Sequence, residues 1–130
     1  MDSKTLLLLI IDDDELIQAV LSRLIQKYGY KYEIAENGLN GIEKVKQETY
    51  DLVFLDTVMP KMDGVETLKI IKQIKPELPV VIMSSSAKQT LEEEAKKLNP
   101  YRFFLKPFEI KELAEVIEEI AKAKSSTTSK

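Results

Sequence analysis

The chain has 130 residues, a formal net charge of -3, and neither cysteine nor histidine. This length suits one ordinary domain with a real hydrophobic core. The composition excludes disulfides, thiolate nucleophiles, histidine-ligated metals, Ser-His-Asp catalysis and a phosphohistidine on this chain. Because the chain is acidic and has no basic stripe, it offers no electrostatic case for binding nucleic acid.

Apolar runs in the sequence are short. None approaches the roughly 18–20 residues of a membrane span. The run at 6–11 is too short for a signal peptide and leads directly into acidic residues. We therefore expect a cytoplasmic protein that contacts no membrane.

Two kinds of apolar pattern alternate along the chain. Short continuous runs are typical of strands buried on both faces of a sheet, and apolar residues spaced by three and four are typical of helices. In chain order, the patterns predict a strand at 5–11, a helix at 14–28, a weaker strand at 30–35, a helix at 39–48, a strand at 51–55, a helix from 65 that stops before Pro76, a strand at 79–83, a helix at 91–98, a strand at 102–105 and a helix at 110–121. This alternation predicts an α/β fold with a single doubly wound, five-stranded parallel sheet and helices on both faces.

Two helix boundaries carry clear signals. The helix at 14–28 has an acid for its N-cap, Asp13 or Asp14, and Gly29 at its end. Beyond the last helix, residues 125–130 are polar and rich in serine and threonine, which predicts a tail or the start of a linker.

Polar residues stand where four of the predicted strands end. Asp12 and Asp13 follow the first strand, Asp56 the third, Ser84 the fourth and Lys106 the fifth. Because the carboxyl ends of parallel strands line one edge of the sheet, these groups are expected to meet in a shallow pocket. Three carboxylates repel one another unless a cation lies between them, and oxygen ligands favour Mg²⁺. A lone ammonium and a lone hydroxyl beside that ion suit a phosphoryl group.

Each signal also has a purely structural explanation. The acids at 12–14 favour a helix N-terminus, Ser84 fits a plain loop, and Lys106 before Pro107 fits a solvated turn. Their joint occurrence, in this order and at strand ends, favours a functional site.

Four segments carry a resemblance to a known family. They are residues 11–14 (Ile-Asp-Asp-Asp), 55–64 (Leu-Asp-Thr-Val-Met-Pro-Lys-Met-Asp-Gly), 81–85 (Val-Ile-Met-Ser-Ser) and 105–108 (Leu-Lys-Pro-Phe). With these motifs the chain resembles the receiver domains of two-component response regulators over about residues 4–123. The resemblance implies the flavodoxin-like strand order 2-1-3-4-5, a receiver domain over 1–123, and a polar Ser/Thr tail or linker start over 124–130. It also implies a phosphorylation-activated signalling switch and not an enzyme.

The resemblance further implies a chemical role for three of the strand-end residues. Asp56 accepts the phosphoryl group as an acyl phosphate. Ser84 hydrogen-bonds a phosphoryl oxygen, and Lys106 pairs with the phosphoryl group and, before it arrives, with Asp56. Physical chemistry supports these roles, because charge on the phosphoryl oxygens needs fixed donors and the attacking carboxylate must be ionised.

The implied cofactor is Mg²⁺. Asp13 and Asp56 are expected to bind it directly, Asp12 mainly through water, and the backbone carbonyl of Val58 supplies another ligand.

The implied output is a conformational shift. Ser84 moves toward the phosphoryl group, and Phe103, an aromatic residue of the fifth strand, turns inward. The bond between Lys106 and Pro107 is expected to be cis. The implied phosphoryl donor is a sensor histidine kinase or a histidine phosphotransfer protein. The downstream protein partner is expected on the face made by the fourth helix, the fifth strand and the fifth helix.

Other classes of protein also use some of these features. A haloacid-dehalogenase-type, Mg²⁺-dependent aspartyl-phosphate phosphatase places its nucleophile in an Asp-x-Asp pair, which Asp12 and Asp14 mimic, and it would release phosphate from added substrates. A flavodoxin is disfavoured because the acids at 12–14 would repel the FMN phosphate. A receiver-like binding module that is not phosphorylated is a third alternative. The chain is expected to be either a stand-alone regulator or a receiver cut from a longer protein.

Overall fold

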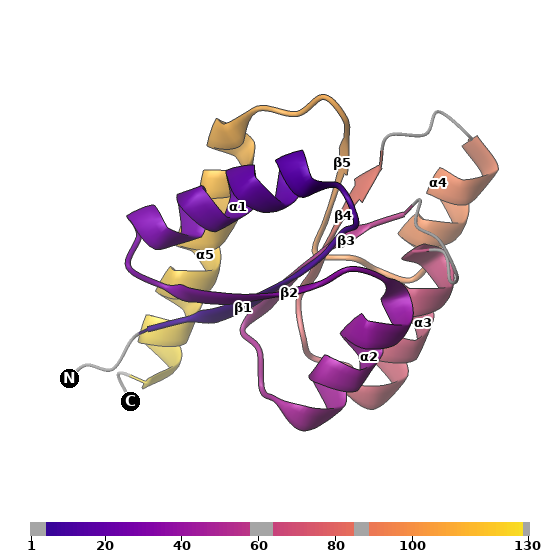
Figure 1. The fold of residues 1–130 in the computed structure, drawn as a ribbon. Coiled ribbons are helices and arrows are strands. Elements are labelled where there is room, and N and C mark those ends of the chain that lie inside the picture. Colours follow the sequence, from indigo (N-terminus) through magenta and orange to yellow (C-terminus); the bar gives the residue numbers. More distant parts are fainter. Residues whose placement is uncertain (1–4, 58–63, 85–88, 129–130) are drawn as a thin grey trace.

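The computed structural model in Figure 1 describes residues 5–57, 64–84 and 89–128. Strands and helices alternate along the chain, as the sequence predicts. The elements are β1 (Leu7–Ile11), α1 (Glu15–Lys27), β2 (Lys31–Ala35), α2 (Gly38–Gln47), β3 (Leu52–Asp56), α3 (Gly64–Ile74), β4 (Val80–Ser84), α4 (Gln89–Lys97), β5 (Arg102–Leu105) and α5 (Ile110–Thr128).

The strands form one parallel sheet in the order β2-β1-β3-β4-β5, so the predicted strand order is confirmed. The order changes direction at β1, because the chain goes from β1 to β2 at one edge and then returns to β3 on the other side of β1. Ligand sites in open α/β sheets lie at the carboxyl ends of the strands beside such a switch point. Asp12 and Asp56 stand there, at the ends of β1 and β3.

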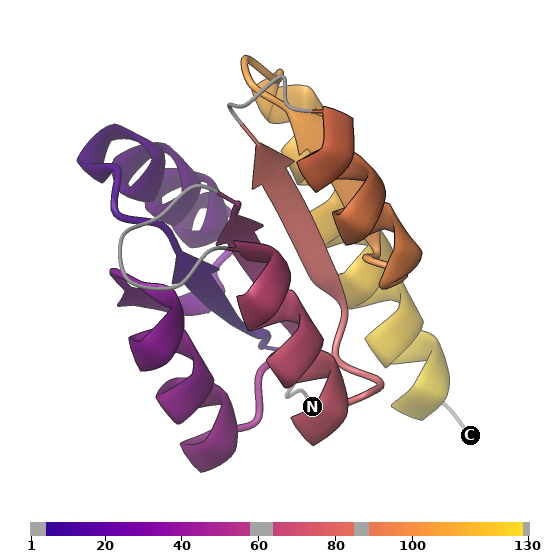
Figure 2. The same cartoon turned by 90° about the vertical axis from the view of Figure 1, so that its right-hand side faces the viewer.

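Helices cover both faces of the sheet (Figure 1, Figure 2). Leu8 and Ile10 of β1 face the layer made by α1 and α5, whereas Leu9 and Ile11 face the layer made by α2 and α3. This alternation follows from the two-residue period of a strand. Because a fully buried Leu or Ile contributes about 1.5–3 kcal/mol, both layers stabilise the sheet that carries the strand-end residues.

The boundaries of α1 show which acid is structural. Asp14 is the N-cap, and its side chain accepts a hydrogen bond of 2.9 Å from the backbone N–H of Leu16. After the helix, Gly29 has a φ of 79°, in the left-handed region that glycine adopts without steric cost. Asp13 is therefore not needed as the cap and lies exposed beside the strand ends.

Helix α5 is longer than the sequence predicts. It continues to Thr128, into the segment for which a tail or linker start was expected. No glycine or proline interrupts residues 110–128, and a polar composition by itself does not stop a helix. Near its end, Lys124 Nζ lies 3.2 Å from Asp51 Oδ1, and Asp51 Oδ2 accepts a hydrogen bond of 2.8 Å from the Leu7 N–H. Like the other helices of the described chain, α5 does not combine the length and apolarity that crossing a membrane requires.

Candidate functional site

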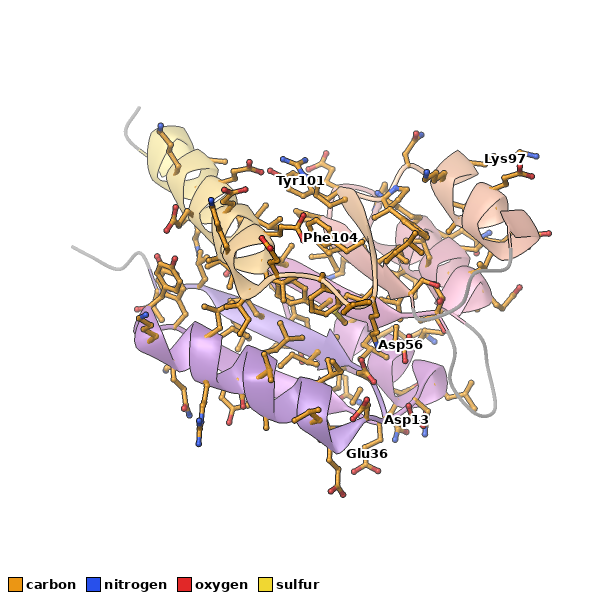
Figure 3. The ribbon with its side chains drawn as sticks, turned by 90° about the horizontal axis from the view of Figure 1, so that it is seen from above. Asp13, Glu36, Asp56, Lys97, Tyr101 and Phe104 are labelled. Carbon is orange, nitrogen blue, oxygen red and sulfur yellow. The ribbon has the colours of Figure 1, made fainter. Side chains whose placement is uncertain are left out.

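Three carboxylates meet at the carboxyl edge of the sheet. Asp12 and Asp13 directly follow β1 and Asp56 is the last residue of β3, and one carboxylate oxygen from each lies within 4.8 Å of the others. Asp12 and Asp56 are buried, whereas Asp13 is exposed. Figure 3 shows Asp13 and Asp56 near each other at this edge. The structure thus brings together the three carboxylates that the sequence predicts as metal ligands.

Asp12 is held in place through both its backbone and its side chain. Its N–H donates to the carbonyl of Ala35 at 3.1 Å, which continues the pairing of β1 with β2. Its carbonyl accepts a hydrogen bond of 2.7 Å from Gln18 Nε2, and its Oδ1 accepts one of 2.9 Å from the Asp14 N–H. Gln18 lies one turn into α1 and holds the backbone of Asp12 through this hydrogen bond. Sequence reasoning did not identify it.

The position of Asp12 is electrostatically unfavourable for a carboxylate. Its pKa is raised from 3.8 to about 6. Burial is the largest cause and the negative charge of Asp56 adds to it, whereas the hydrogen bond from the Asp14 backbone and the charge of Lys106 offset part of the rise. Among the described residues, Asp12 Oδ2 is a fully buried side-chain oxygen without a hydrogen-bond partner. This oxygen and the two neighbouring carboxylates form a donor set that fits a hard divalent cation such as Mg²⁺.

Lys106 lies between the two buried carboxylates. Its Nζ is 3.6 Å from Asp12 Oδ2 and 3.7 Å from Asp56 Oδ1, and only 15% of its side chain is exposed. The backbone N–H of Lys106 donates to the Ser84 carbonyl at 2.7 Å, so the lysine is anchored to the end of β4. The bond between Lys106 and Pro107 is cis, as the sequence predicts. The pairing of Lys106 with Asp12, which the sequence did not predict, makes the lysine a counter-ion for two acids.

A pair of buried hydroxyls adjoins the carboxylates. Ser84, the last residue of β4, accepts a hydrogen bond of 2.9 Å from Thr57 Oγ1. Thr57 directly follows Asp56, and both hydroxyl residues are almost fully buried. Sequence reasoning identified Ser84 but missed Thr57. The parallel register would have found it, because Asp56 pairs with Met83 and the next residues along both strands are Thr57 and Ser84.

The two phenylalanines of β5 point to opposite faces of the sheet. Phe103 packs with the α2–α3 layer and Phe104 with the α1–α5 layer, as the two-residue period of a strand requires. The Lys96 ammonium lies 5.4 Å from the centre of the Phe103 ring, within the range of a cation–π contact. Phe103, the expected switch residue, is therefore partly buried beneath a charge from α4.

Parts of two sequence motifs fall outside the described residues. These are residues 58–63 of the motif at 55–64, with the Val58 carbonyl that was expected as a metal ligand, and Ser85 of the motif at 81–85.

The raised pKa of Asp12 gives a testable dependence of stability on pH. A carboxyl whose pKa is higher in the folded state disfavours folding once it ionises, so this cost is absent below about pH 4 and complete above about pH 6. The shift corresponds to about 2–3 kcal/mol. We expect Asp12→Asn to raise the free energy of unfolding in EDTA at pH 7.5 by about 1–3 kcal/mol, with the gain shrinking toward pH 4.

Urea unfolding at several pH values measures this effect. The exposed Glu36→Gln variant, which also removes one negative charge, is the control and should change the free energy of unfolding little at any pH. A gain for Asp12→Asn that is the same at pH 4 and pH 7.5 would contradict the prediction.

The fold and the site together define a class of protein. The flavodoxin-like sheet carries an acid cluster and the largely buried Lys106 at its switch point. A domain of this kind can hold a cation at the acids and an anion at the lysine, side by side. The family model of the response regulator receiver domain matches residues 8–118. The chain therefore belongs to the family of receiver domains of two-component systems. Receiver domains are phosphorylatable signalling domains with a regulatory role.

Individual relatives agree with this family. The transcriptional regulatory protein ZraR of Klebsiella oxytoca is 37% identical over 112 residues, which are 86% of this chain and 25% of that protein. The sporulation initiation phosphotransferase F of Bacillus subtilis is 36% identical over 119 residues, which are 92% of this chain and 96% of that protein. A CheY-like response regulator receiver domain protein from Methanospirillum hungatei has a TM-score of 0.87 at 24% identity, covering 95% of this chain and 98% of its own, a likeness of fold. The chain thus spans a small part of one relative and nearly the whole of another.

Proposed function

We propose that Asp56 accepts a phosphoryl group from a sensor histidine kinase or a histidine phosphotransfer protein, with Mg²⁺ bound beside it, and that the phosphorylated chain signals to a downstream protein. The carrying observation is the acid cluster with Lys106, whose Nζ lies 3.7 Å from Asp56 Oδ1. Receiver domains generally bind Mg²⁺ at such an acidic site. Asp12, Asp13 and Asp56 are the residues that would hold it here.

The residues of the site divide the chemistry of phosphoryl transfer among them. An Asp56 oxygen attacks phosphorus, the bond from phosphorus to the donor's imidazole nitrogen breaks, and that nitrogen keeps the electron pair. The Lys106 ammonium keeps Asp56 ionised for the attack and then contacts a phosphoryl oxygen. Ser84 donates a hydrogen bond to another phosphoryl oxygen. When bound, Mg²⁺ neutralises charge on the carboxylates and on the transferred group.

The relay from the site runs through Ser84 and Phe103 to the face made by α4, β5 and α5. Ser84 and Lys106 are joined through the backbone at 2.7 Å, so a movement at either strand end reaches both. Phe103 lies three residues before Lys106 and contacts Lys96 of α4. On the same face, Arg102 of β5 pairs with Glu119 of α5 at 2.9 Å. Phosphorylation then acts by stabilising one of two arrangements of these residues.

Mass spectrometry tests the central claim. After incubation with acetyl phosphate and Mg²⁺, the protein should gain the mass of one phosphate, and hydroxylamine should remove it because an acyl phosphate is labile to this reagent. Asp56→Asn should gain none. A protein that gains no phosphate, or an Asp56→Asn variant that gains as much as the wild type, would refute the proposed function.

An exposed apolar surface beside the site is the place where we expect the phosphoryl donor to dock. It lines a groove made by Leu16, Ile17 and Val20 of α1 and by Pro107, Phe108 and Ile110, with Lys106 at its rim. Leu16 and Ile110 are 70% and 51% exposed, which is unusual for large apolar side chains. A donor seated on this surface would bring its phosphohistidine close to Asp56.

We expect Leu16→Gln to lower the rate of phosphotransfer from a phosphorylated histidine phosphotransfer protein about tenfold, because one central apolar contact is lost. Phosphorylation by acetyl phosphate, which needs no protein contact, should be unchanged. Leu39→Gln is the matched control, since Leu39 is also exposed and is likewise the second residue of its helix. Equal losses in the two variants, or a loss with acetyl phosphate as well, would contradict this docking surface.

A further inference from the structure

Backbone hydrogen bonds on several sides hold Thr57 and Ser84 next to each other. Thr57 Oγ1 donates to Ser84 Oγ at 2.9 Å, and the exposed fractions of the two residues are 1% and 3%. The Thr57 N–H donates to the Met83 carbonyl at 3.1 Å, and the Ser84 carbonyl accepts the Lys106 N–H at 2.7 Å. The two hydroxyls are thus held side by side by strand pairing and not by their own hydrogen bond alone.

The start of α3 also fixes Thr57. The Gly64 N–H donates to the Thr57 carbonyl at 2.9 Å. A Cβ at Gly64 would lie only 2.4 Å from Thr57 Cα and 2.5 Å from the Asp56 carbonyl oxygen, so only glycine fits against this strand end. Thr57 therefore lies between β4 and α3 with little room to move, directly after the residue that we propose is phosphorylated.

The direction of the hydrogen bond has a chemical consequence. A hydroxyl has one proton to donate and lone pairs that accept. Phosphoryl oxygens only accept, so Ser84 must donate its proton to contact them. When Thr57 donates to Ser84 Oγ, this hydrogen bond uses the acceptor side of Ser84 and not the proton that a phosphoryl oxygen needs. A hydroxyl that accepts one hydrogen bond also donates a stronger one.

We propose that Thr57 is a positioning residue, which holds the Ser84 hydroxyl in the orientation that donates to the phosphoryl group on Asp56. The inference rests on the proposed function and deepens it. Thr57 does not touch the phosphoryl group itself and acts only through Ser84. The opposite polarity, in which Ser84 donates to Thr57, would make Thr57 a restraint that phosphorylation has to break.

Thr57→Val tests the proposal because it removes the hydroxyl and keeps the branched shape. We expect the rate of Asp56 phosphorylation by acetyl phosphate, and the affinity for beryllium trifluoride as a mimic of the phosphoryl group, to fall about threefold to tenfold. Thr57→Ser, which keeps the donor, should restore both to near the wild-type level. In a Ser84→Ala background, Thr57→Val should cause no further loss, because its effect passes through the Ser84 hydroxyl.

Several results would overturn this assignment. Wild-type rates in Thr57→Val would show that the hydroxyl is not used, and faster phosphorylation would show that Thr57 restrains Ser84. The same fractional loss with and without the Ser84 hydroxyl would show that Thr57 has only a structural role. Circular dichroism checks the fold of each variant, and Thr57→Ala replaces Thr57→Val in the same comparison if the valine variant does not fold.

Phosphorylation of the wild-type protein distinguishes a failure of the proposed function from a failure of the role assigned to Thr57. If wild-type Asp56 is not phosphorylated, the proposed function fails and this inference fails with it. If wild-type Asp56 is phosphorylated and the comparison of single and double variants shows no coupling between Thr57 and Ser84, only the role of Thr57 is refuted.

Discussion

Asp13→Ala is expected to weaken Mg²⁺ binding and to slow phosphorylation of Asp56 by acetyl phosphate about a hundredfold. Asp13 is the exposed member of the three carboxylates that lie within 4.8 Å of one another, so its side chain can reach a cation without further desolvation. Its loss removes both a ligand and a full negative charge. The two buried acids that remain have Lys106 as a shared counter-ion and hold a divalent cation less well.

Titration with Mg²⁺ and the rate of phosphate incorporation measure these two effects. Asp14→Asn is the matched control, because it removes the neighbouring charge while asparagine still caps α1. It should keep most of the Mg²⁺ affinity. If wild type and Asp13→Ala bind Mg²⁺ equally well, the metal site has been assigned to the wrong residues.

The architecture was predictable because each strand is a short apolar run and each helix has apolar residues at three- and four-residue spacing. β3 and β4 are buried over all their residues, which is why their sequences show no alternation of polar and apolar positions. Strand ends were predictable to about one residue. This sufficed to place Asp56 and Ser84 at the same edge, since any parallel sheet brings its carboxyl ends together.

Contacts that depend on exact register and side-chain reach were not predictable in this way. Thr57 meets Ser84 only because Asp56 pairs with Met83, and a shift of one residue would turn the hydroxyl to the other face. The reach of Lys106 to Asp12 depends on the spacing of β1, β3 and β5 at their ends. Gln18 gives no signal of its own, because a polar residue on an amphipathic helix is ordinarily solvated.

The end of α5 could not be predicted from the local sequence for a different reason. A run of serine and threonine is typical of linkers, yet the helix continues to Thr128. The contact that favours this, between Lys124 and Asp51, joins residues 73 positions apart in the sequence. Local composition carries no information about such a contact, so tertiary structure decides where the helix ends.

Lys106→Ala should separate phosphorylation from the conformational response. Asp56 keeps its place at the end of β3, so it should still accept phosphate from acetyl phosphate, about tenfold more slowly because one positive charge beside the phosphoryl oxygens is lost. The response should be lost almost completely. Lys106 directly follows β5, and its Nζ lies 3.7 Å from Asp56 Oδ1. Its backbone N–H is hydrogen-bonded to the Ser84 carbonyl, and Phe103 lies three residues before it.

NMR spectra recorded before and after saturating phosphorylation measure this response at Phe103 and its neighbours. Lys124→Ala is the control, since Lys124 also pairs with an aspartate but lies at the amino edge of the sheet, where Asp51 accepts from the first residue of β1. It should be phosphorylated normally and show the wild-type shifts. Wild-type shifts around Phe103 in phosphorylated Lys106→Ala would mean that the lysine neutralises charge but transmits nothing, and the path from Asp56 to β5 would then have to run through Ser84 alone.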